Sequence, residues 1–335
     1  VGVLLARHYW TNRVMEVETL LVRELEGRGL RVLPAFCNSI RDEGLGNKGS
    51  LLWSREIFLD GAGAPRVDAL IKLQPFFLGG RKGAGSTPGG AGSAADGAVA
   101  QEGAEFFVFL GVPVFQPVFS SAKTLEEWEN DPQGLGSEVA WSVAMPEFEG
   151  VIEPFYLGGG KRLSDDATGA EIERRVAHPE RVARLASRVR RWLSLRAKPV
   201  AERKVAFILH NNPCASVEAS VGGAAKLDSL ESVALILREM RDAGYAVDVP
   251  ETGAALIENI MERKAISEFR WTTVQEIAAK GGTLARLGLE KYRTWFDAWP
   301  EKVRTRISEA WGPPPGTEMD GVPAAMVLDG DILLT

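Results

Sequence analysis

The sequence contains 335 residues, and its 45% hydrophobic and 25% charged side chains are the composition of a folded protein of two or three domains, not of a disordered chain. Its 45 acidic and 39 basic residues give a net charge of −6, which excludes the basic field that a nucleic-acid partner requires. With only Cys37 and Cys214, and no run near the roughly 18 to 20 apolar residues of a membrane span, the chain is predicted to be cytoplasmic and without a disulfide framework.

Both ends of the chain have the pattern of buried strands. The sequence begins without Met on an apolar, β-prone run at 1–6 and ends on another at 331–335. Natural termini rarely interrupt core strands at both ends, so the sequence favours a piece of a longer polypeptide.

The N-terminal part alternates between strand and helix patterns. Apolar runs at 1–6, 30–36 and 67–73 predict strands, and helical spacing at 12–28 and 51–59 predicts the helices between them. This βαβαβ order predicts a parallel sheet with right-handed crossovers.

Residues 79–103 are mostly Gly, Ala and Ser, with few large apolar side chains. Such a segment buries too little surface to offset the entropy of ordering, so we predict a surface loop or a disordered insertion. A phosphate-binding loop is disfavoured, because the order Gly-x-x-x-x-Gly-Lys-Ser/Thr is absent and no helix start follows.

Strand or helix-strand patterns return at 104–118. A short helix is then predicted at 124–130, with Thr124 as its N-cap and Glu127 at the capping-box position. An amphipathic helix with arginines on its outer face is predicted at 179–195.

Pro199 interrupts the chain before a buried strand predicted at 204–209, so we place a domain boundary near residue 200. The sequence thus predicts one α/β domain over 1–200 and a second over 201–335, the second with a helical C-terminal part and incomplete. Both are expected to contain mainly parallel sheets flanked by helices, doubly wound as in Rossmann-like or periplasmic-binding-protein-like folds.

The rest of the second half predicts helices, one strand and a terminal hairpin. These are helices at 228–241, 252–264, 272–280 and 289–311 with a break before Pro300, a strand at 245–249, and a hairpin of 324–328 and 331–335 joined by a type I′ turn.

The densest polar run, 209–228, follows the strand predicted at 204–209. In open parallel sheets, loops at the carboxyl ends of strands and amides at helix starts line the ligand crevice. A ligand loop would use His210, Asn211, Glu218 and the amides around Gly222 and Gly223. Alternatively, Asn-Pro at 212–213 forms a turn, the glycines permit positive φ, and Asp228 or Ser229 caps the next helix.

Three histidines and one aromatic run are further candidates. His210 is a candidate axial ligand or proton shuttle, His178 is predicted at the surface, and His8 belongs either to a packed aromatic corner or to a ligand contact. The run 269–271 either packs before a capped helix or forms a wall for a flat ligand, with Arg270 meeting a carboxylate. Zinc-enzyme motifs are absent from the sequence.

Several motifs occur in order between about residue 100 and the C-terminus: Trp128-Glu129, Pro132-Gln133-Gly134-Leu135, Pro146-Glu147-Phe148-Glu149-Gly150, 205–213, 221–229, 240–245 and Trp311-Gly312-Pro313-Pro314-Pro315-Gly316. Together they resemble the large subunit of cobaltochelatases (CobN) and, more loosely, the H subunit of magnesium chelatases.

The resemblance implies an internal fragment of the tetrapyrrole-binding large subunit of an ATP-dependent chelatase, a ligase that inserts Co²⁺ or Mg²⁺ into a corrin or porphyrin precursor. It implies AAA+ ATPase and integrin-domain partner subunits that use ATP and Mg²⁺. The fragment is expected to be inactive alone.

Metal insertion needs a base that removes both pyrrole protons and a polar group that strips water from the ion. We expect His210 and Glu218 in these roles, with His210 as the candidate metal ligand. The substrate-binding residues that we expect in the polar loop and the aromatic run are Asn211, Asn212, Gly222, Gly223, Lys226, Arg270 and Trp271. The family's His-Gly-Ser-x-Glu motif is absent from this sequence.

Two other functions are compatible with the residues. A non-catalytic two-domain α/β module could bind a small ligand in its cleft, without any chemistry. A nucleotide-dependent transferase of the doubly wound class is disfavoured, because the sequence has no phosphate loop.

Overall fold

The computed structural model describes residues 1–80, 94–210, 221–263, 273–316, 318–319, 322–323, 327–328 and 331–334. The chain divides into unit 1, Val1–Ala197, and unit 2, Lys198–Thr335, and each is described by itself. Five of the expected site residues lie outside the described part of the chain: Asn211, Asn212, Glu218, Arg270 and Trp271.

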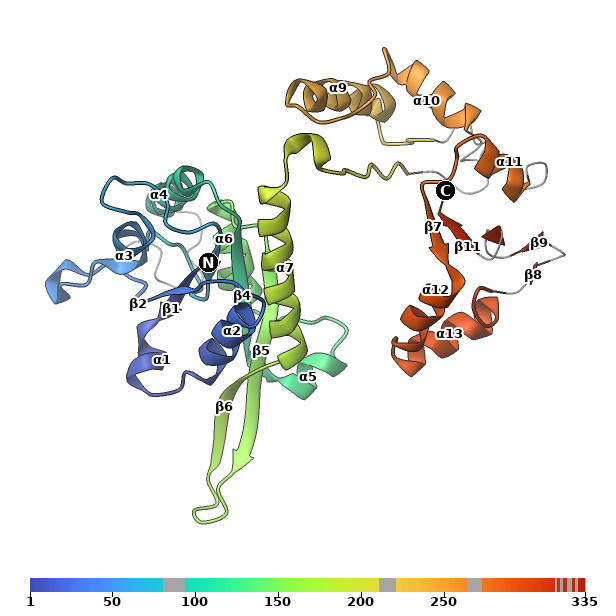
Figure 1. Cartoon of the computed structure of the whole chain (residues 1–335). Coiled ribbons are helices and arrows are strands. Elements are labelled where there is room, and N and C mark those ends of the chain that lie inside the picture. Colours follow the sequence, from blue (N-terminus) through green and yellow to red (C-terminus); the bar gives the residue numbers. More distant parts are fainter. Residues whose placement is uncertain are drawn as a thin grey trace. The chain divides into compact units, whose positions relative to one another are not determined.

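A six-stranded sheet in the order β2-β1-β3-β4-β5-β6 forms the middle of unit 1 (Figure 1). Its strands are β1 (Gly2–Ala6), β2 (Leu33–Cys37), β3 (Leu70–Lys72), β4 (Val114–Thr124), β5 (Pro154–Ser164) and β6 (Glu171–Ala177). Strands β1 to β5 pair in parallel with one another, and β6 is antiparallel to β5. The predicted α/β class, with a mostly parallel sheet, is confirmed.

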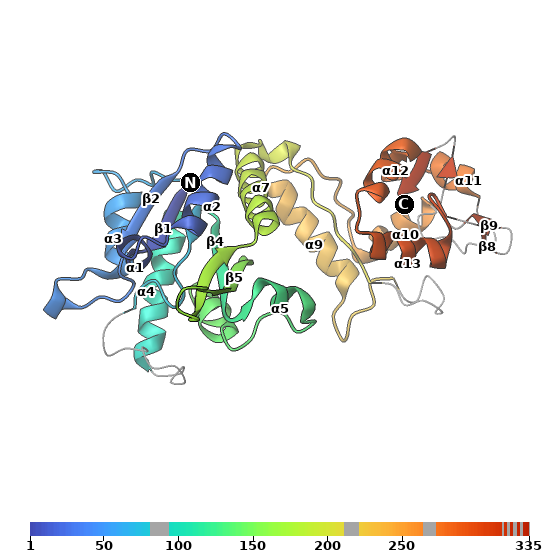
Figure 2. The ribbon, with the colours of Figure 1, turned by 90° about the horizontal axis from the view of Figure 1, so that it is seen from below.

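Helices cover both faces of this sheet because alternate strand residues point to opposite sides. Val3 and Leu5 pack with α2 (Glu16–Glu26) and α7 (Pro179–Ala197), whereas Leu4 packs with α3 (Gly49–Phe58) and α4 (Ala94–Leu110). Figure 2 shows α2 beside α7, with α3 and α4 on the other side of the strands. The shorter helices are α1 (Arg7–Thr11), η1 (Glu43–Leu45), α5 (Leu125–Asn130), η2 (Ala140–Ala144) and α6 (Met145–Phe148).

The capping box at the start of α5 is confirmed. The Thr124 hydroxyl accepts the Glu127 N–H at 3.2 Å, and the Glu127 carboxylate accepts the Thr124 N–H at 2.8 Å. Both partners are local in sequence, which explains why the motif alone predicts the helix start.

Two features of unit 1 differ from the predictions. Residues 94–103 begin α4 instead of continuing a loop, because the helix goes on to bury Phe106 and Leu110 in the core; residues 81–93 lie outside the described part. The hairpin of β5 and β6, which projects beyond the rest of unit 1 in Figure 1, was not predicted. Its glycine run has low β-propensity, yet a Cβ at Gly158 would lie only 2.1 Å from the Val176 carbonyl oxygen, so the close strand approach requires glycine.

Unit 2 contains η3 (Val200–Glu202), α9 (Ser229–Asp242), α10 (Gly253–Glu262), α11 (Val274–Ala279), α12 (Leu289–Asp297) and α13 (Glu301–Trp311). Its described strands are β7 (Ala285–Gly288), β8 (Glu318–Met319), β9 (Val322–Pro323), β10 (Val327–Leu328) and β11 (Asp331–Leu334). They form one sheet in the order β10-β11-β7 and a β8-β9 pair, all antiparallel. The prediction of a mainly parallel, doubly wound sheet is therefore wrong for the described strands of this unit, which pair in antiparallel fashion and not through βαβ crossovers. The antiparallel pairing of β10 with β11 confirms the terminal hairpin, whose turn residues lie outside the described part.

The strands predicted at 204–209 and 245–249 are not strands: within the described residues, both segments lack strand pairing. Ile208 is 95% exposed. The sequence pattern showed apolar side chains, but a strand also needs a neighbour that accepts and donates its backbone hydrogen bonds, and periodicity does not identify one.

Candidate functional site

The loop predicted to bind substrate, 209–228, is described only at its two ends, because residues 211–220 lie outside the described part. Arg270 and Trp271 lie outside it as well. Of the expected site residues, the structure therefore describes His210, Gly222, Gly223 and Lys226.

The two ends of this loop meet through the backbone. The Gly222 N–H donates to the His210 carbonyl at 2.8 Å, and the Ser229 hydroxyl donates to the Gly222 carbonyl. Gly222 has a φ of +72°, and a Cβ there would lie 2.6 Å from the Ser229 hydroxyl oxygen, so glycine is needed for this closure. The backbone of His210 is thereby fixed beside the start of α9, and the side chains of His210 and Lys226 are exposed.

A different polar site lies at the carboxyl edge of the unit 1 sheet. The chain passes from β1 to β2 on one side of β1 and then returns to β3 on the other side. In open parallel sheets this reversal of strand order creates the crevice in which ligands bind. Four buried side chains gather there, and we call Lys72, Gln74, Gln116 and Glu149 the sheet-edge cluster.

Lys72, the last residue of β3, is completely buried. Its ammonium group donates to the carbonyls of Gln74 (3.1 Å) and Phe76 and to Oε1 of Gln116 (3.2 Å). Burial lowers the pKa of Lys72 to about 8, and the negative charge of Glu149 opposes that shift. Two of these three hydrogen bonds go to the segment after β3, so Lys72 fixes the path of that segment.

The segment after β3 contains a strained aromatic residue. Phe76 has a φ of +65°, a left-handed conformation that costs a bulky residue about 1 to 3 kcal/mol. Its N–H donates to the Trp141 carbonyl at 2.8 Å, and Trp141 lies in the π-helix η2. Lys72 and Trp141 thus hold the two backbone groups of Phe76, whose side chain remains 39% exposed. Strained residues and π-helices both concentrate at functional sites.

Gln74 ties three strands together below this segment. Its amide nitrogen donates to the carbonyls of Leu5 (2.8 Å) and Cys37 (3.2 Å), and the Ser50 hydroxyl donates to its amide oxygen. Burial raises the pKa of the Cys37 thiol, which keeps it protonated and unreactive at neutral pH. These groups satisfy one another, which indicates an architectural role.

Glu149 holds the far end of the same segment. Its Oε1 accepts the Leu78 N–H at 2.6 Å, while its Oε2 is buried without a partner among the described residues. Burial raises the pKa of Glu149 to about 7, against the opposing charge of Lys72. A Cβ at Gly103 of α4 would lie 2.0 Å from Oε1, so the helix approaches the carboxyl group as closely as glycine allows. Glu149 belongs to the motif at 146–150.

The sheet-edge cluster was not predicted from the sequence, although the sequence contains one signal for it. Lys72 and Gln74 are polar residues within and directly after the apolar run 67–73 that predicted β3. A charged residue in a fully buried strand requires several hydrogen-bond partners. Those partners, Gln116 and Phe76, could not be identified from spacing.

The other two histidines lie in aromatic clusters. The rings of His8 and Tyr9 lie 3.9 Å apart, and the Arg175 guanidinium lies 4.1 Å from the Tyr9 ring. Burial, followed by the charge of Arg175, lowers the pKa of His8. His8 itself is exposed and contacts Tyr9, its neighbour in sequence, and the ligand contact that the sequence left open stays a prediction. His178, expected at the surface, is only 18% exposed and forms a 3.0 Å hydrogen bond with Glu129.

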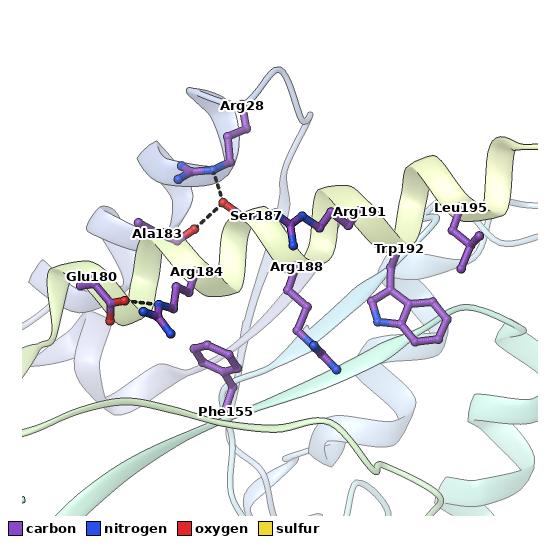
Figure 3. Close-up of a pocket in the computed structure, with 10 residues that line it drawn as sticks. All are labelled: Arg28, Phe155, Glu180, Ala183, Arg184, Ser187, Arg188, Arg191, Trp192 and Leu195. Carbon is purple, nitrogen blue, oxygen red and sulfur yellow. Dashed lines mark hydrogen bonds and ion pairs between the residues drawn. The ribbon is translucent and has the colours of Figure 1, made fainter. Parts of the chain in front are cut away.

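A groove beside α7 is the third candidate site, and we call it the α7 groove. It has a volume of about 690 Å³ and is lined by Arg28, Phe155, Glu180, Ala183, Arg184, Ser187, Arg188, Arg191, Trp192 and Leu195. Figure 3 shows Arg188 and Trp192 pointing from α7 to the side on which Phe155 lies. Cations and exposed apolar surface therefore occur together in one groove.

Neither a metal site nor a membrane span is found in the described part of the chain. Within that part, no three or more His, Cys, Asp or Glu side chains are grouped so that they could hold a metal ion. None of its helices has both the length and the apolar character needed to cross a bilayer.

The family model CobN/Magnesium Chelatase matches residues 1–334. An uncharacterized protein of Methanocaldococcus jannaschii is 41% identical over 98% of this chain and 25% of its own length. The aerobic cobaltochelatase subunit CobN of Sinorhizobium sp is 28% identical over 88% of this chain and 20% of its own length. The chloroplastic magnesium-chelatase subunit ChlH of Oryza sativa subsp. indica is 28% identical over 94% of this chain and 20% of its length.

Among solved structures, the catalytic subunit of cobaltochelatase from Mycobacterium tuberculosis has a similar fold, with a TM-score of 0.63. It is 24% identical and covers 99% of this chain, which corresponds to 24% of that chain. The present chain therefore spans between a fifth and a quarter of the length of these relatives.

Proposed function

The chain belongs to the CobN/magnesium chelatase family, and from that premise we propose that it forms part of the tetrapyrrole-binding large subunit of a metal chelatase. The match of the family model to residues 1–334 is the observation that carries the proposal. The whole subunit would insert Co²⁺ or Mg²⁺, its substrate metal, into a corrin or porphyrin precursor.

The finer features of the proposal follow from the same family resemblance. The reaction is an ATP-dependent ligation that forms nitrogen–metal bonds, in the cytoplasm. AAA+ ATPase and integrin-domain partner subunits hydrolyse ATP with Mg²⁺ and supply the work of insertion. Without them the chain alone has no chelatase activity.

We assign the chemical roles to the loop before α9. Insertion requires removal of both pyrrole protons and of water bound to the ion, and His210 and Glu218 supply the base and the polar group. Asn211, Asn212, Gly222, Gly223 and Lys226 contact the substrate, together with Arg270 and Trp271. The closure of this loop at His210 and Gly222, beside the first amides of α9, supports a binding role for it.

The sheet-edge cluster has a supporting role in this proposal. Its side chains are buried and bonded to one another or to the backbone, so they hold the strained segment around Phe76 without touching substrate themselves. Phe76, whose side chain is partly exposed, is the member of this region that can meet a ligand.

Metal insertion by the full-length subunit and its partners tests the proposal. The absorption change of the tetrapyrrole reports insertion, and His210→Ala should lower turnover about 100-fold while tetrapyrrole affinity is retained. Turnover unchanged in His210→Ala removes His210 from the mechanism. A wild-type protein that binds no tetrapyrrole contradicts the proposed function itself.

A further inference from the structure

The α7 groove concentrates positive charge in a chain whose net charge is −6. Its lining includes four arginines, Arg28, Arg184, Arg188 and Arg191, and a single acidic residue, Glu180. Guanidinium groups bind carboxylates and other anions through charge-assisted hydrogen bonds, so a local cluster of them in an acidic chain points to an anionic ligand.

The arginines differ in how many donors remain available. Arg188 uses Nε and Nη2 in a two-point ion pair with Glu153, at 2.6 and 2.8 Å. Arg184 pairs with Glu180, and Arg28 with Glu24. Within the described residues Arg191 makes neither an ion pair nor a hydrogen bond through its side chain, so its five N–H donors face solvent at the groove.

Helical spacing arranges these groups in one stripe. Arg184, Arg188 and Arg191 recur at intervals of four and three residues, which places them on one face of α7. Trp192 and Leu195 continue the stripe and are 38% and 42% exposed, and Phe155 forms the facing apolar wall (Figure 3). At about 1.5 Å per residue, the stripe from residue 184 to residue 195 extends over about 16 Å.

This combination selects a particular kind of ligand. Exposed tryptophan and leucine match a broad apolar ring, and guanidinium groups match carboxylates in two-point hydrogen bonds. A volume of about 690 Å³ lies within the range of roughly 300 to 1,000 Å³ that is usual for organic ligands.

A second cavity in unit 1 is less suited to a polyanion. It has a volume of about 510 Å³ and lies between the segment after α1 and the β5–β6 hairpin. Three arginines line it, Arg13, Arg174 and Arg175, together with Glu16 and Glu173, and its lining contains no tryptophan that could match a broad ring. Arg175 is also already paired with the buried Glu18, at 2.7 Å.

We propose that the α7 groove binds the carboxylate-bearing rim of a tetrapyrrole, with Arg191 holding a carboxylate and Trp192 and Leu195 against the ring. The inference rests on the proposed function, because that function supplies the class of ligand. It adds a binding surface in unit 1 to the loop before α9 that is assigned above to unit 2.

The test uses two porphyrins of opposite charge and the full-length protein. Tetrakis(4-carboxyphenyl)porphyrin carries four carboxylates, and tetrakis(N-methylpyridinium)porphyrin carries four cationic groups instead. We expect the anionic porphyrin to quench tryptophan fluorescence in a saturable manner and the cationic one to bind far more weakly. Arg191→Glu should weaken anionic porphyrin binding about tenfold or more.

Arg190→Glu is the matched control. Arg190 neighbours Arg191 in α7 and is also exposed, but it does not line the groove. Arg190→Glu changes the net charge by the same amount as Arg191→Glu, so we expect the porphyrin affinity of this control to stay within about twofold of the wild type. The unfolding temperature of both variants should match that of the wild type, because both side chains lie at the surface.

Each other outcome overturns a defined claim. Equal losses of anionic porphyrin affinity in Arg191→Glu and Arg190→Glu indicate nonspecific charge attraction and contradict binding in the α7 groove. If Arg191→Glu leaves the anionic porphyrin affinity unchanged, the α7 groove is not a porphyrin site, and the proposed function is unaffected. Loss of a partner subunit from Arg191→Glu, with porphyrin affinity retained, reassigns the groove to an acidic protein. If the wild-type protein binds neither porphyrin, the proposed function fails and the groove proposal fails with it.

Discussion

The sheet-edge cluster and the α7 groove use charged side chains in opposite ways. At the sheet edge, Lys72 and Glu149 are buried and their hydrogen bonds go to the protein's own backbone and side chains. In the α7 groove, Arg191 is exposed and has no protein partner among the described residues. A buried charge of this kind fixes the fold around it, whereas an exposed and unpaired charge is available to a ligand.

The largest expected effect is on the sheet edge. Lys72→Met removes the donor to two carbonyls and to Gln116, and leaves those acceptors buried without a partner. We expect the free energy of unfolding to fall by about 3 to 5 kcal/mol, measured by urea unfolding. A loss below about 1 kcal/mol would show that the cluster does not hold the segment after β3.

The pH dependence of stability also tests the sheet-edge cluster, through Glu149. The pKa of Glu149 is about 7 in the folded protein against an ordinary value of 4.5, so the folded state keeps this proton over a range in which the unfolded chain releases it. The stabilisation is therefore complete below pH 4.5 and is lost as the pH rises to about 7, by about 2 to 3 kcal/mol.

Glu149→Gln, whose side chain cannot ionise, should remove this loss of stability with rising pH. Urea unfolding of both proteins between pH 4 and about 7 measures it as the difference between two curves, in which the titrating groups that do not interact with Glu149 cancel. Lys72 does contribute to the difference, because the charge of Glu149 opposes the lowering of the Lys72 pKa by burial. Parallel curves for the variant and the wild type would mean that folding does not raise the pKa of Glu149 above its ordinary value.

Two glycines of α4 offer a smaller and signed contrast. Gly103→Ala places a methyl group against the Glu149 carboxyl group and should destabilise the protein by about 1 to 3 kcal/mol. Gly97→Ala, on the same helix with open space around it, should stabilise by up to about 1 kcal/mol because alanine favours helix. Thermal unfolding of the pair decides the point, since equal shifts of the same sign would exclude the close approach to Glu149.

The strain at Phe76 gives the smallest expected effect. Phe76→Gly and Phe76→Ala both remove the ring, but only glycine adopts a φ of +65° without a steric cost. The glycine variant should therefore be more stable than the alanine variant by about 1 kcal/mol in urea unfolding. An alanine variant of equal or greater stability would show that Lys72 and Trp141 hold no strain at this position.

The sequence predicted the parts of the fold that depend on neighbouring residues. The βαβαβ order of unit 1 follows from apolar periodicity, and the start of α5 follows from Thr124 and Glu127, three residues apart. The hairpin of β5 and β6 was missed, because the glycines that let the strands approach each other also erase the strand pattern. The segment 204–209 was wrongly predicted as a strand, because apolar character does not provide a pairing partner.

The candidate sites divide in the same way. A polar run such as 209–228 is visible in the sequence, and its roles for His210 and Glu218 stay predictions. The sheet-edge cluster was not visible, because Lys72 meets Gln116 and the charge of Glu149 only through the folded sheet. Strand order, not spacing along the chain, brings such residues together.

One paired measurement tests the comparison most directly: anionic porphyrin affinity and urea stability determined together on full-length Arg191→Glu and Lys72→Met. The account predicts that Arg191→Glu loses about tenfold in affinity and keeps its stability. It predicts that Lys72→Met loses about 3 to 5 kcal/mol of stability and, where folded, keeps its affinity. Parallel loss of both properties in both variants, or affinity unchanged in Arg191→Glu, would contradict it.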